Sequence, residues 1–261
     1  MHSRTARFRS AAVAACMSFV ALFLFLVALP FQLLGRPKHF FIHRVLRRWC
    51  QLLLKLLGIH VVVSGKEFLA AQNRIVVSNH ASWLDIPILI ASFPGQLRII
   101  GKKELGSWPL VGWYIKLAGH FLLDRNNDRQ GRQVIRAAAA ALRTYGVSSL
   151  IFPEGTTTAD GFLQKFRKGA LALALWAQTD IQPVAVLGSY RILSQHESLP
   201  ITTGTVEVRF GEGIPVARHL TTSELTDMVR SALINLGVAE NPLRLPAQAG
   251  LVHAASEQHS P

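Results

Sequence analysis

A histidine and an aspartate separated by four residues are the side chains of this sequence that are best suited to chemistry. His80 and Asp85 follow the run Ile75 to Ser78, whose β-branched residues are typical of a buried strand. Ligands of open α/β sheets bind beyond the carboxyl ends of the strands, so the pair would lie at such an edge. If Asp85 accepts the Nδ1 proton of His80, the Nε2 atom is left to take a proton from a hydroxyl. The pair therefore predicts general-base catalysis.

The position of Ser82 determines whether these two side chains can meet. Residues five apart do not share a face of a continuous helix, so the spacing requires a helix that starts between them. Ser82 is a favourable N-cap and would place Asp85 at position N3, where the carboxylate turns back over the helix entrance. Alternatively, Asp85 only completes a capping box and His80 is a hydrogen-bonded loop residue. These residues alone leave both interpretations open.

A second polar turn follows another short apolar run, Leu150 to Phe152. In a parallel sheet the end of this run lies at the same edge as His80, so Glu154, Gly155 and Thr156 would face the same cleft. Gly155 allows close approach of the backbone, and the N–H groups of such a turn bind a phosphate or a developing oxyanion. The two turns together predict one site at one edge of the sheet.

Six short β-branched runs alternate with helical patterns along the chain. The predicted strands are 59–63, 75–78, 97–101, 150–152, 183–187 and 206–210, and the predicted helices are 128–143, 170–177 and 221–236. This alternation predicts an α/β fold, with a mainly parallel sheet flanked by helices. We expect one folded domain over residues 59–240 and a flexible tail over residues 241–261.

Two segments before this domain indicate a membrane. Residues 11–35 carry no charge, and at about 1.5 Å per residue they can cross a hydrocarbon core of roughly 30 Å. The run either spans once or dips in and returns near Pro30; the alternative of a cleaved signal peptide lacks an A-x-A site. Residues 39–57 form a basic amphipathic helix, which is either interfacial or an ordinary surface helix packed on the domain. We therefore predict a membrane-anchoring segment over residues 1–58.

The charge of the chain indicates an anionic partner. Lys and Arg number 28 against 15 Asp and Glu, a net charge of +13, while 50% of the residues are hydrophobic. The hydrophobic content favours an anionic membrane, and the absence of an RNA-binding aromatic motif or zinc-finger spacing argues against nucleic acid. Basic residues are more numerous after the apolar run than before it, which predicts a cytoplasmic domain.

In order and spacing, four blocks resemble the glycerolipid acyltransferase family, of the 1-acyl-sn-glycerol-3-phosphate acyltransferase type. These blocks are His80 to Asp85 (its H-x4-D motif), Gly119 to Arg125, Phe152 to Thr156 and Gln182 to Val186. The resemblance implies a fatty acyl donor, either acyl-CoA or acyl-carrier protein, and a lysolipid acceptor. We expect neither a cofactor nor a metal, because a fatty-acyl thioester is reactive enough without the help of a Lewis acid. It also implies a membrane location, which we take to be the bacterial inner membrane with the catalytic domain on its cytoplasmic side.

The resemblance also implies roles for single residues. His80 would be the base and Asp85 its orienting partner; Lys103 and Arg125 would hold the acceptor's phosphate. The acceptor would also contact Glu154, Gly155 and Thr156. The implied reaction acylates the sn-2 hydroxyl of 1-acyl-glycerol-3-phosphate and gives phosphatidic acid, a step of phospholipid biosynthesis. The leaving group is a thiolate whose thiol has a pKa of about 8.5, so no strong general acid is needed. The lipid hydroxyl attacks directly, so no nucleophile on the enzyme is needed.

One position departs from the family. Thr157 stands where the family's third block usually continues with Arg, so a guanidinium that would bind phosphate is missing. Either another basic residue, such as Arg125, Lys103, Arg167 or Lys168, replaces it, or the acceptor has no phosphomonoester. The second explanation predicts a lyso-ornithine lipid as the acceptor. Two further alternatives are a non-catalytic membrane adaptor and a metal site made from His80, Asp85 and Glu154.

Overall fold

The computed structural model describes only part of the chain. The described residues are 38–69, 74–108, 112, 115–116, 118–124, 128–158, 160–167, 169–193 and 202–241. The predicted membrane helix, 11–35, and the predicted tail beyond residue 241 lie outside them. Among the described residues, no helix combines the length and the apolar character that crossing a membrane requires.

Seven strands form one sheet in the described part of the chain, in the order β1-β7-β6-β2-β5-β3-β4. Their bounds are β1 Ile59–Ser64, β2 Ile75–Ser78, β3 Leu97–Lys102, β4 Phe121–Leu123, β5 Ser148–Ile151, β6 Ile181–Leu187 and β7 Gly204–Phe210. The pairing of β6 with β7 is antiparallel and the other pairings are parallel. The predicted mainly parallel sheet is confirmed, and β1 and β7 run against the other five strands at one edge.

The sheet contains one strand that the sequence did not reveal. β4 is three residues long and pairs only with β3 at the second edge of the sheet, so it carries too little periodicity to be recognised. β5 begins at Ser148, two residues before its predicted start. The prediction missed Ser148 and Ser149 because both are polar, although both are buried. The Oγ atom of Ser148 accepts the N–H of Arg74 at 3.2 Å, which satisfies one of these buried hydroxyls.

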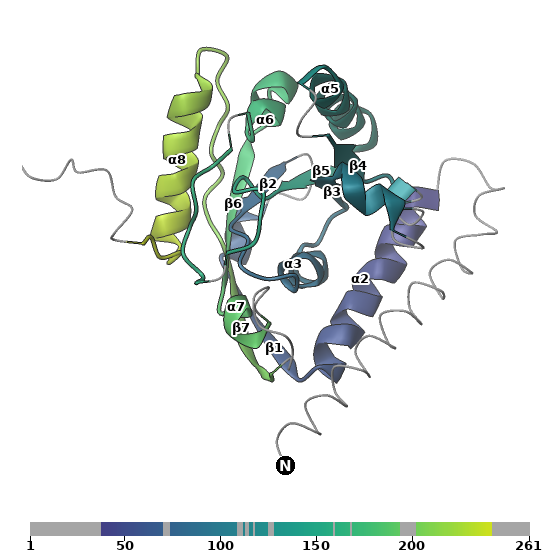
Figure 1. Cartoon of the computed structure of the whole chain (residues 1–261), viewed down its shortest axis with the longest axis vertical. Helices are drawn as coiled ribbons and strands as arrows, with labels where there is room; N and C mark the ends of the chain where they lie inside the picture. The colour runs from purple at the N-terminus through teal and green to yellow at the C-terminus, as the bar shows by residue number, and fades with distance from the viewer. Residues whose placement is uncertain are drawn as a thin grey trace, which may run out of the picture.

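Helices cover both faces of the sheet (Figure 1). One face carries α5 (Asp128–Tyr145), α6 (Ala172–Ala177) and α8 (Thr222–Asn235), and the other carries α2 (Lys38–Leu56) and α3 (Asp85–Ser92). In β2, Ile75 and Val77 point into the first core and Val76 into the second. Burial on both faces explains why this strand is a continuous apolar run.

Helix α2 is part of the folded core. Its residues Leu46 and Cys50 pack near Ile90 of α3, and Leu53 and Leu54 join the core beneath the sheet. Helical spacing predicts an apolar face made of Ile42, Val45, Leu46, Trp49, Leu53 and Leu56. This prediction was partly wrong, because Leu56 is 66% exposed whereas Cys50 and Leu54 are buried. The buried face of α2 is therefore that of a helix packed on the domain.

The remaining helices are either short or lie within two residues of their predicted bounds. α8 begins with the predicted capping box, in which the side chains of Thr221 and Glu224 each accept the other's backbone N–H. α6 begins two residues later than predicted, at Ala172. The short helices α7 (Ser189–Ile192), η1 (Lys66–Phe68) and η2 (Lys103–Ser107) were not predicted, because one turn is too short to show a helical period.

Candidate active site

The carboxyl ends of the five mutually parallel strands bring the predicted site residues to one edge of the sheet. β2 lies between β5 and β6, and β3 and β4 follow beyond β5. Within three residues of these ends lie His80 after β2, Lys103 after β3, Asp124 after β4 and Glu154 after β5. Residues far apart in the sequence therefore meet where open α/β sheets bind ligands.

His80 and Asp85 make the contact that their spacing predicted. His80 Nδ1 lies 3.0 Å from Asp85 Oδ2, and the same oxygen accepts the N–H groups of Ala81 at 2.7 Å and Ser82 at 2.8 Å. The Asp85 side chain is fully buried, whereas that of His80 is 15% exposed. Among the described residues Nε2 of His80 makes no hydrogen bond. The aspartate therefore orients the ring through Nδ1, and Nε2 is the nitrogen that remains for a substrate.

The helix after His80 begins later than predicted. α3 starts at Asp85 with Leu84 as its N-cap, so Ser82 is not the cap residue. Pro87 has no N–H to donate, and the first i to i−4 bond near this end runs from Ile88 to Leu84, at 3.0 Å. Ser82 still stabilises the entry turn, because its Oγ accepts the N–H of Leu84 and donates to the carbonyl of Leu193.

Neighbouring strands hold the turn that carries His80. The side-chain amide of Asn79 bonds both the N–H and the C=O of Val186 in β6, each at 2.9 Å. The carbonyl of His80 accepts the N–H of Thr158 at 3.0 Å. The ring of Phe152 stacks on the imidazole with centroids 3.9 Å apart and planes 18° apart. The imidazole is thus fixed in both position and plane.

Glu154 connects two backbone segments instead of facing open space. Its Oε1 atom accepts the N–H of His80 and its Oε2 atom that of Gln164, both at 2.7 Å. The residue is 3% exposed, and this burial raises the pKa of the carboxyl to about 7 even though the two N–H groups lower it. Each oxygen accepts one backbone N–H, and the acceptor contact implied by the family resemblance stays a prediction.

The alternative of a metal site draws on His80, Asp85 and Glu154. Asp85 Oδ2 and both oxygens of Glu154 accept backbone N–H groups, whereas Asp85 Oδ1 is buried without a hydrogen-bond partner in the described structure. Within the described residues, no group of three or more His, Cys, Asp or Glu side chains is arranged to hold a metal ion.

A cavity of about 500 Å³ lies beside the second turn. Phe152, Pro153 and Gly155 line it, and Gly155 has a φ of 75°, which closes the turn back to the carbonyl of Phe152. Its other walls combine apolar side chains with charged ones; the charged residues are Asp124, Arg132 and Arg167. Phe152 lines this cavity and also stacks on the His80 ring, so this one side chain connects the cavity to the imidazole.

Of the residues predicted to bind phosphate, some lie near the cavity and others lie outside the described residues. Lys103 reaches the margin of this cavity, where its Nζ pairs with Asp124 Oδ2 at 3.1 Å. Arg125 and Lys168 lie outside the described residues. Thr156 is exposed next to the cavity, and the Oγ1 atom of Thr157 is buried without a hydrogen-bond partner in the described structure.

Arg132 is a cavity residue that the sequence analysis missed. It lies in the first half of α5, among other arginines, and the sequence shows only that this helix is amphipathic and basic. A helical period separates the buried face from the exposed one, but it does not show which exposed arginine faces a strand end. Arg167, considered from the sequence as a replacement for the missing guanidinium, lines the same cavity.

Comparisons with known proteins identify the family to which this chain is similar. Residues 60–187 match the family profile described as Acyltransferase. The chain is 30% identical over 215 residues to "1-acyl-sn-glycerol-3-phosphate acyltransferase" of Saccharomyces cerevisiae, covering 78% of this chain and 70% of that one. It is 39% identical over 148 residues to "Lyso-ornithine lipid O-acyltransferase" of Pseudomonas aeruginosa, covering 57% of this chain and 54% of the other.

A solved structure has the same fold. The 1-acyl-sn-glycerophosphate acyltransferase of Thermotoga maritima superposes with a TM-score of 0.76 at 24% identity, covering 91% of this chain and 97% of that one. The chain spans about half the length of several curated relatives that it matches.

Proposed function

The chain belongs to the acyltransferase family that includes the 1-acyl-sn-glycerol-3-phosphate acyltransferases, and on that basis we propose that it transfers a fatty acyl group from a thioester to the hydroxyl of a lysolipid. The observation that carries this proposal is the contact of 3.0 Å between His80 Nδ1 and Asp85 Oδ2, next to a cavity of about 500 Å³. This intact pair also favours an enzyme over a non-catalytic adaptor on the same fold.

In the proposed reaction His80 is the general base. Its Nε2 atom takes the proton of the acceptor hydroxyl while the hydroxyl oxygen attacks the thioester carbonyl carbon. Asp85 keeps the proton on Nδ1 and stabilises the imidazolium that forms. The tetrahedral intermediate then expels the thiolate, which takes the proton back from the imidazolium. The products are the acylated lipid and a free thiol, and the enzyme returns to its first state.

Glu154 acts in this proposal through the position of His80. Its carboxylate holds the N–H groups of His80 and Gln164, residues that lie on two separate loops. We therefore assign it as a positioning residue and keep Gly155 and Thr156 as the acceptor contacts of this turn. Gly155 lines the cavity, and Thr156 is exposed beside it.

The acceptor that we favour is 1-acyl-glycerol-3-phosphate, acylated at its sn-2 hydroxyl to give phosphatidic acid. Arg132 and Arg167 line the cavity, and a guanidinium binds a phosphate through two parallel hydrogen bonds. They would take the place of the arginine that is missing at Thr157, together with Lys103 and Arg125.

A lyso-ornithine lipid is the second candidate for the acceptor. It is supported by the identity of 39% to the Pseudomonas aeruginosa enzyme and by Thr157. An ornithine headgroup carries a carboxylate and an ammonium group. In the cavity, Arg132 and Arg167 would bind the carboxylate and Asp124 would bind the ammonium group. Asp124 also pairs with Lys103.

The donor and the location are proposed on the same basis. We take acyl-CoA or acyl-carrier protein as the donor, with no cofactor, and an anionic membrane as the surface on which the lysolipid is reached. Residues 1–58 would anchor the acyltransferase domain, 59–240, to the cytoplasmic side of the bacterial inner membrane. Nucleic acid has no place in this function.

The test is thiol release by the purified, detergent-solubilised full chain. A long-chain acyl thioester is supplied with lysophosphatidic acid or with lyso-ornithine lipid, and His80→Ala serves as the inactive control. Release that depends on one acceptor identifies that acceptor. Release that depends on neither acceptor, or that persists in the His80→Ala variant, would contradict the proposed function.

A further inference from the structure

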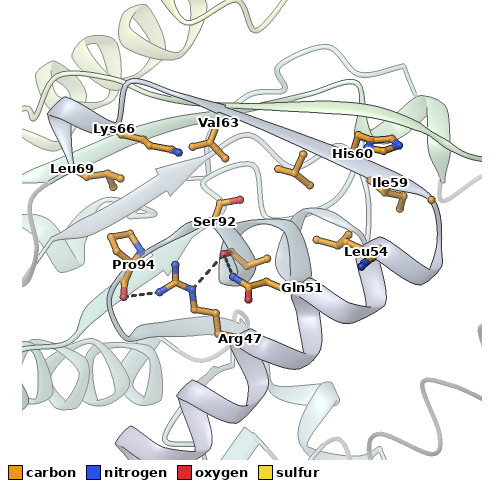
Figure 2. A pocket seen from close by; sticks show the side chains of 14 residues that line it. Arg47, Gln51, Leu54, Ile59, His60, Val63, Lys66, Leu69, Ser92 and Pro94 are labelled. Atoms are coloured by element: carbon orange, nitrogen blue, oxygen red, sulfur yellow. Dashed lines mark hydrogen bonds between the residues drawn. The ribbon is translucent and has the colours of Figure 1, made fainter.

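A second hollow, larger than the cavity beside His80, lies on the α2 side of the sheet. It has a volume of about 730 Å³ and lies between α2, the edge strand β1 and the end of α3 (Figure 2). Its lining includes none of the residues of the two catalytic turns. Ala91, Ser92 and Pro94 come from the last turn of α3 and beyond, whereas Asp85 is at the first. The hollow is therefore separate from the candidate active site.

The floor of this hollow is apolar and its rim is basic. Leu54 and Ile59 are buried in the floor, with Val63 and Leu69 half-buried beside them. The basic residues are Arg47, Lys55 and Lys66, and among the described residues that line the hollow none is acidic. Figure 2 shows that Arg47 and Leu54 come from the α2 side of the hollow, whereas Val63, Lys66 and Leu69 come from β1 and the turn after it.

The basic side chains of the rim are not neutralised inside the fold. Arg47 donates to the carbonyls of Ala91, at 3.4 Å, and Pro94, at 2.9 Å, which are uncharged acceptors. Lys55 and Lys66 are exposed, and neither has an acidic partner among the described residues. A ligand that brings a negative charge to this rim would meet two lysines that are free to bind it.

We propose that this hollow, bounded by Arg47, Leu54, Lys55, Val63, Lys66 and Leu69 and here called the lipid groove, binds one anionic phospholipid of the bilayer. An acyl chain would lie on the apolar floor and the phosphate at the lysines of the rim. An inorganic anion would make no contact that requires the apolar floor, and a neutral lipid would make no contact that requires the basic rim.

The surface next to the lipid groove identifies the bilayer as the source of this lipid. Leu52 and Leu56 lie one helical turn apart on α2, on either side of Lys55 in the sequence, and are 51% and 66% exposed. Exposed leucines beside lysines are typical of a helix that lies in a membrane interface. The groove thus opens beside a surface that suits lipid headgroups. This proposal does not depend on the acyl-transfer chemistry.

Photo-cross-linking of the full chain in detergent micelles tests this proposal. The probe is phosphatidylglycerol with a diazirine in one acyl chain, compared with phosphatidylcholine that has identical chains. We expect adducts on peptides covering residues 47–55 and 59–69, about tenfold more from phosphatidylglycerol than from phosphatidylcholine. Equal yields from the two lipids, or adducts only elsewhere in the chain, would overturn the proposal.

Charge reversal supplies the matched control. The double variant Lys55→Glu, Lys66→Glu should lower the phosphatidylglycerol adducts to the phosphatidylcholine level. Arg143→Glu, Arg218→Glu changes the net charge equally at exposed sites outside the groove and should keep them. Thermal unfolding checks that both variants are folded. The same loss in both double variants, or displacement of the probe by a long-chain acyl thioester, would mean that the groove does not select an anionic phospholipid.

Discussion

The cavity beside His80 and the lipid groove both combine apolar walls with basic side chains, yet they are built in different ways. The cavity adjoins turns that are fixed by hydrogen bonds across the sheet, such as that from His80 to Glu154. The groove lies between a helix and a strand, and its lysines are unpaired among the described residues. Acyl transfer depends on the positions of single atoms, whereas lipid binding requires only apolar area and the right charge. Substitutions should therefore affect the two regions on different scales.

The largest effect is expected from removal of the base. His80→Ala should lower kcat by about 10²- to 10⁴-fold, because the hydroxyl loses its proton acceptor. Thiol release gives kcat, and thermal unfolding shows whether the variant is folded. Arg143→Ala, an exposed change on α5, should keep normal turnover. Normal turnover in His80→Ala would show that His80 is not the base, and the cavity would then be no more sensitive to substitution than the lipid groove.

Glu154→Gln should have the next largest effect. The amide keeps one oxygen for one N–H but presents an NH₂ group to the other, so the loops of His80 and Gln164 would separate. We expect kcat to fall by about 10- to 100-fold, as for a small displacement of a reacting group, with little change in the acceptor KM. A rise in KM at constant kcat would instead make Glu154 an acceptor contact.

Glu154 also predicts how stability depends on pH. Burial raises the pKa of its carboxyl from 4.5 to about 7, so the folded chain holds this proton more tightly than the unfolded chain. Its contribution to the free energy of unfolding should fall as the pH rises from 4.5 to about 7, by at most ~3 kcal/mol. Urea unfolding at both ends of this range should show that fall in the native chain but not in Glu154→Gln. If the free energy of unfolding depends on pH equally in the native chain and in Glu154→Gln, Glu154 is not the source of this pH dependence.

The arginines of the cavity should affect acceptor binding more than turnover. Arg132→Ala and Arg167→Ala should each raise the KM for lysophosphatidic acid about tenfold with kcat nearly unchanged, because a uniform binding contact is lost. Initial rates over a range of acceptor concentrations measure this. An unchanged KM in both variants would exclude these two residues from phosphate binding.

The smallest effect is expected at the wall of the lipid groove. Arg47→Ala removes hydrogen bonds to the carbonyls of Ala91 and Pro94 and should lower the free energy of unfolding by about 1 kcal/mol. Arg48→Ala, on the exposed side of the same helix, is the control and should change it by less than about 0.5 kcal/mol. Urea unfolding distinguishes the two. A large loss of kcat in Arg47→Ala would show that the groove and the active site are coupled through α3.

Local patterns predicted most of the elements but not all of their ends. Ile75 to Ser78 was predicted with its true bounds, because β-branched residues between polar ones mark a strand wherever they occur. The start of α3 was wrong, since Pro87 cannot donate a hydrogen bond and moves the helix start to Asp85. The apolar face of α2 was partly wrong because its boundary depends on where α3 packs.

The sequence by itself determined the contact between His80 and Asp85, because they are five residues apart and one short turn brings them together. It also determined the alternation of strands and helices, which follows from side-chain periodicity. Only the tertiary structure decided that Glu154 holds the backbone of His80, that Arg132 faces the cavity, and that Lys66 faces α2 across a groove. These contacts join residues that are distant in the chain, and no local pattern records which distant partner a side chain will meet.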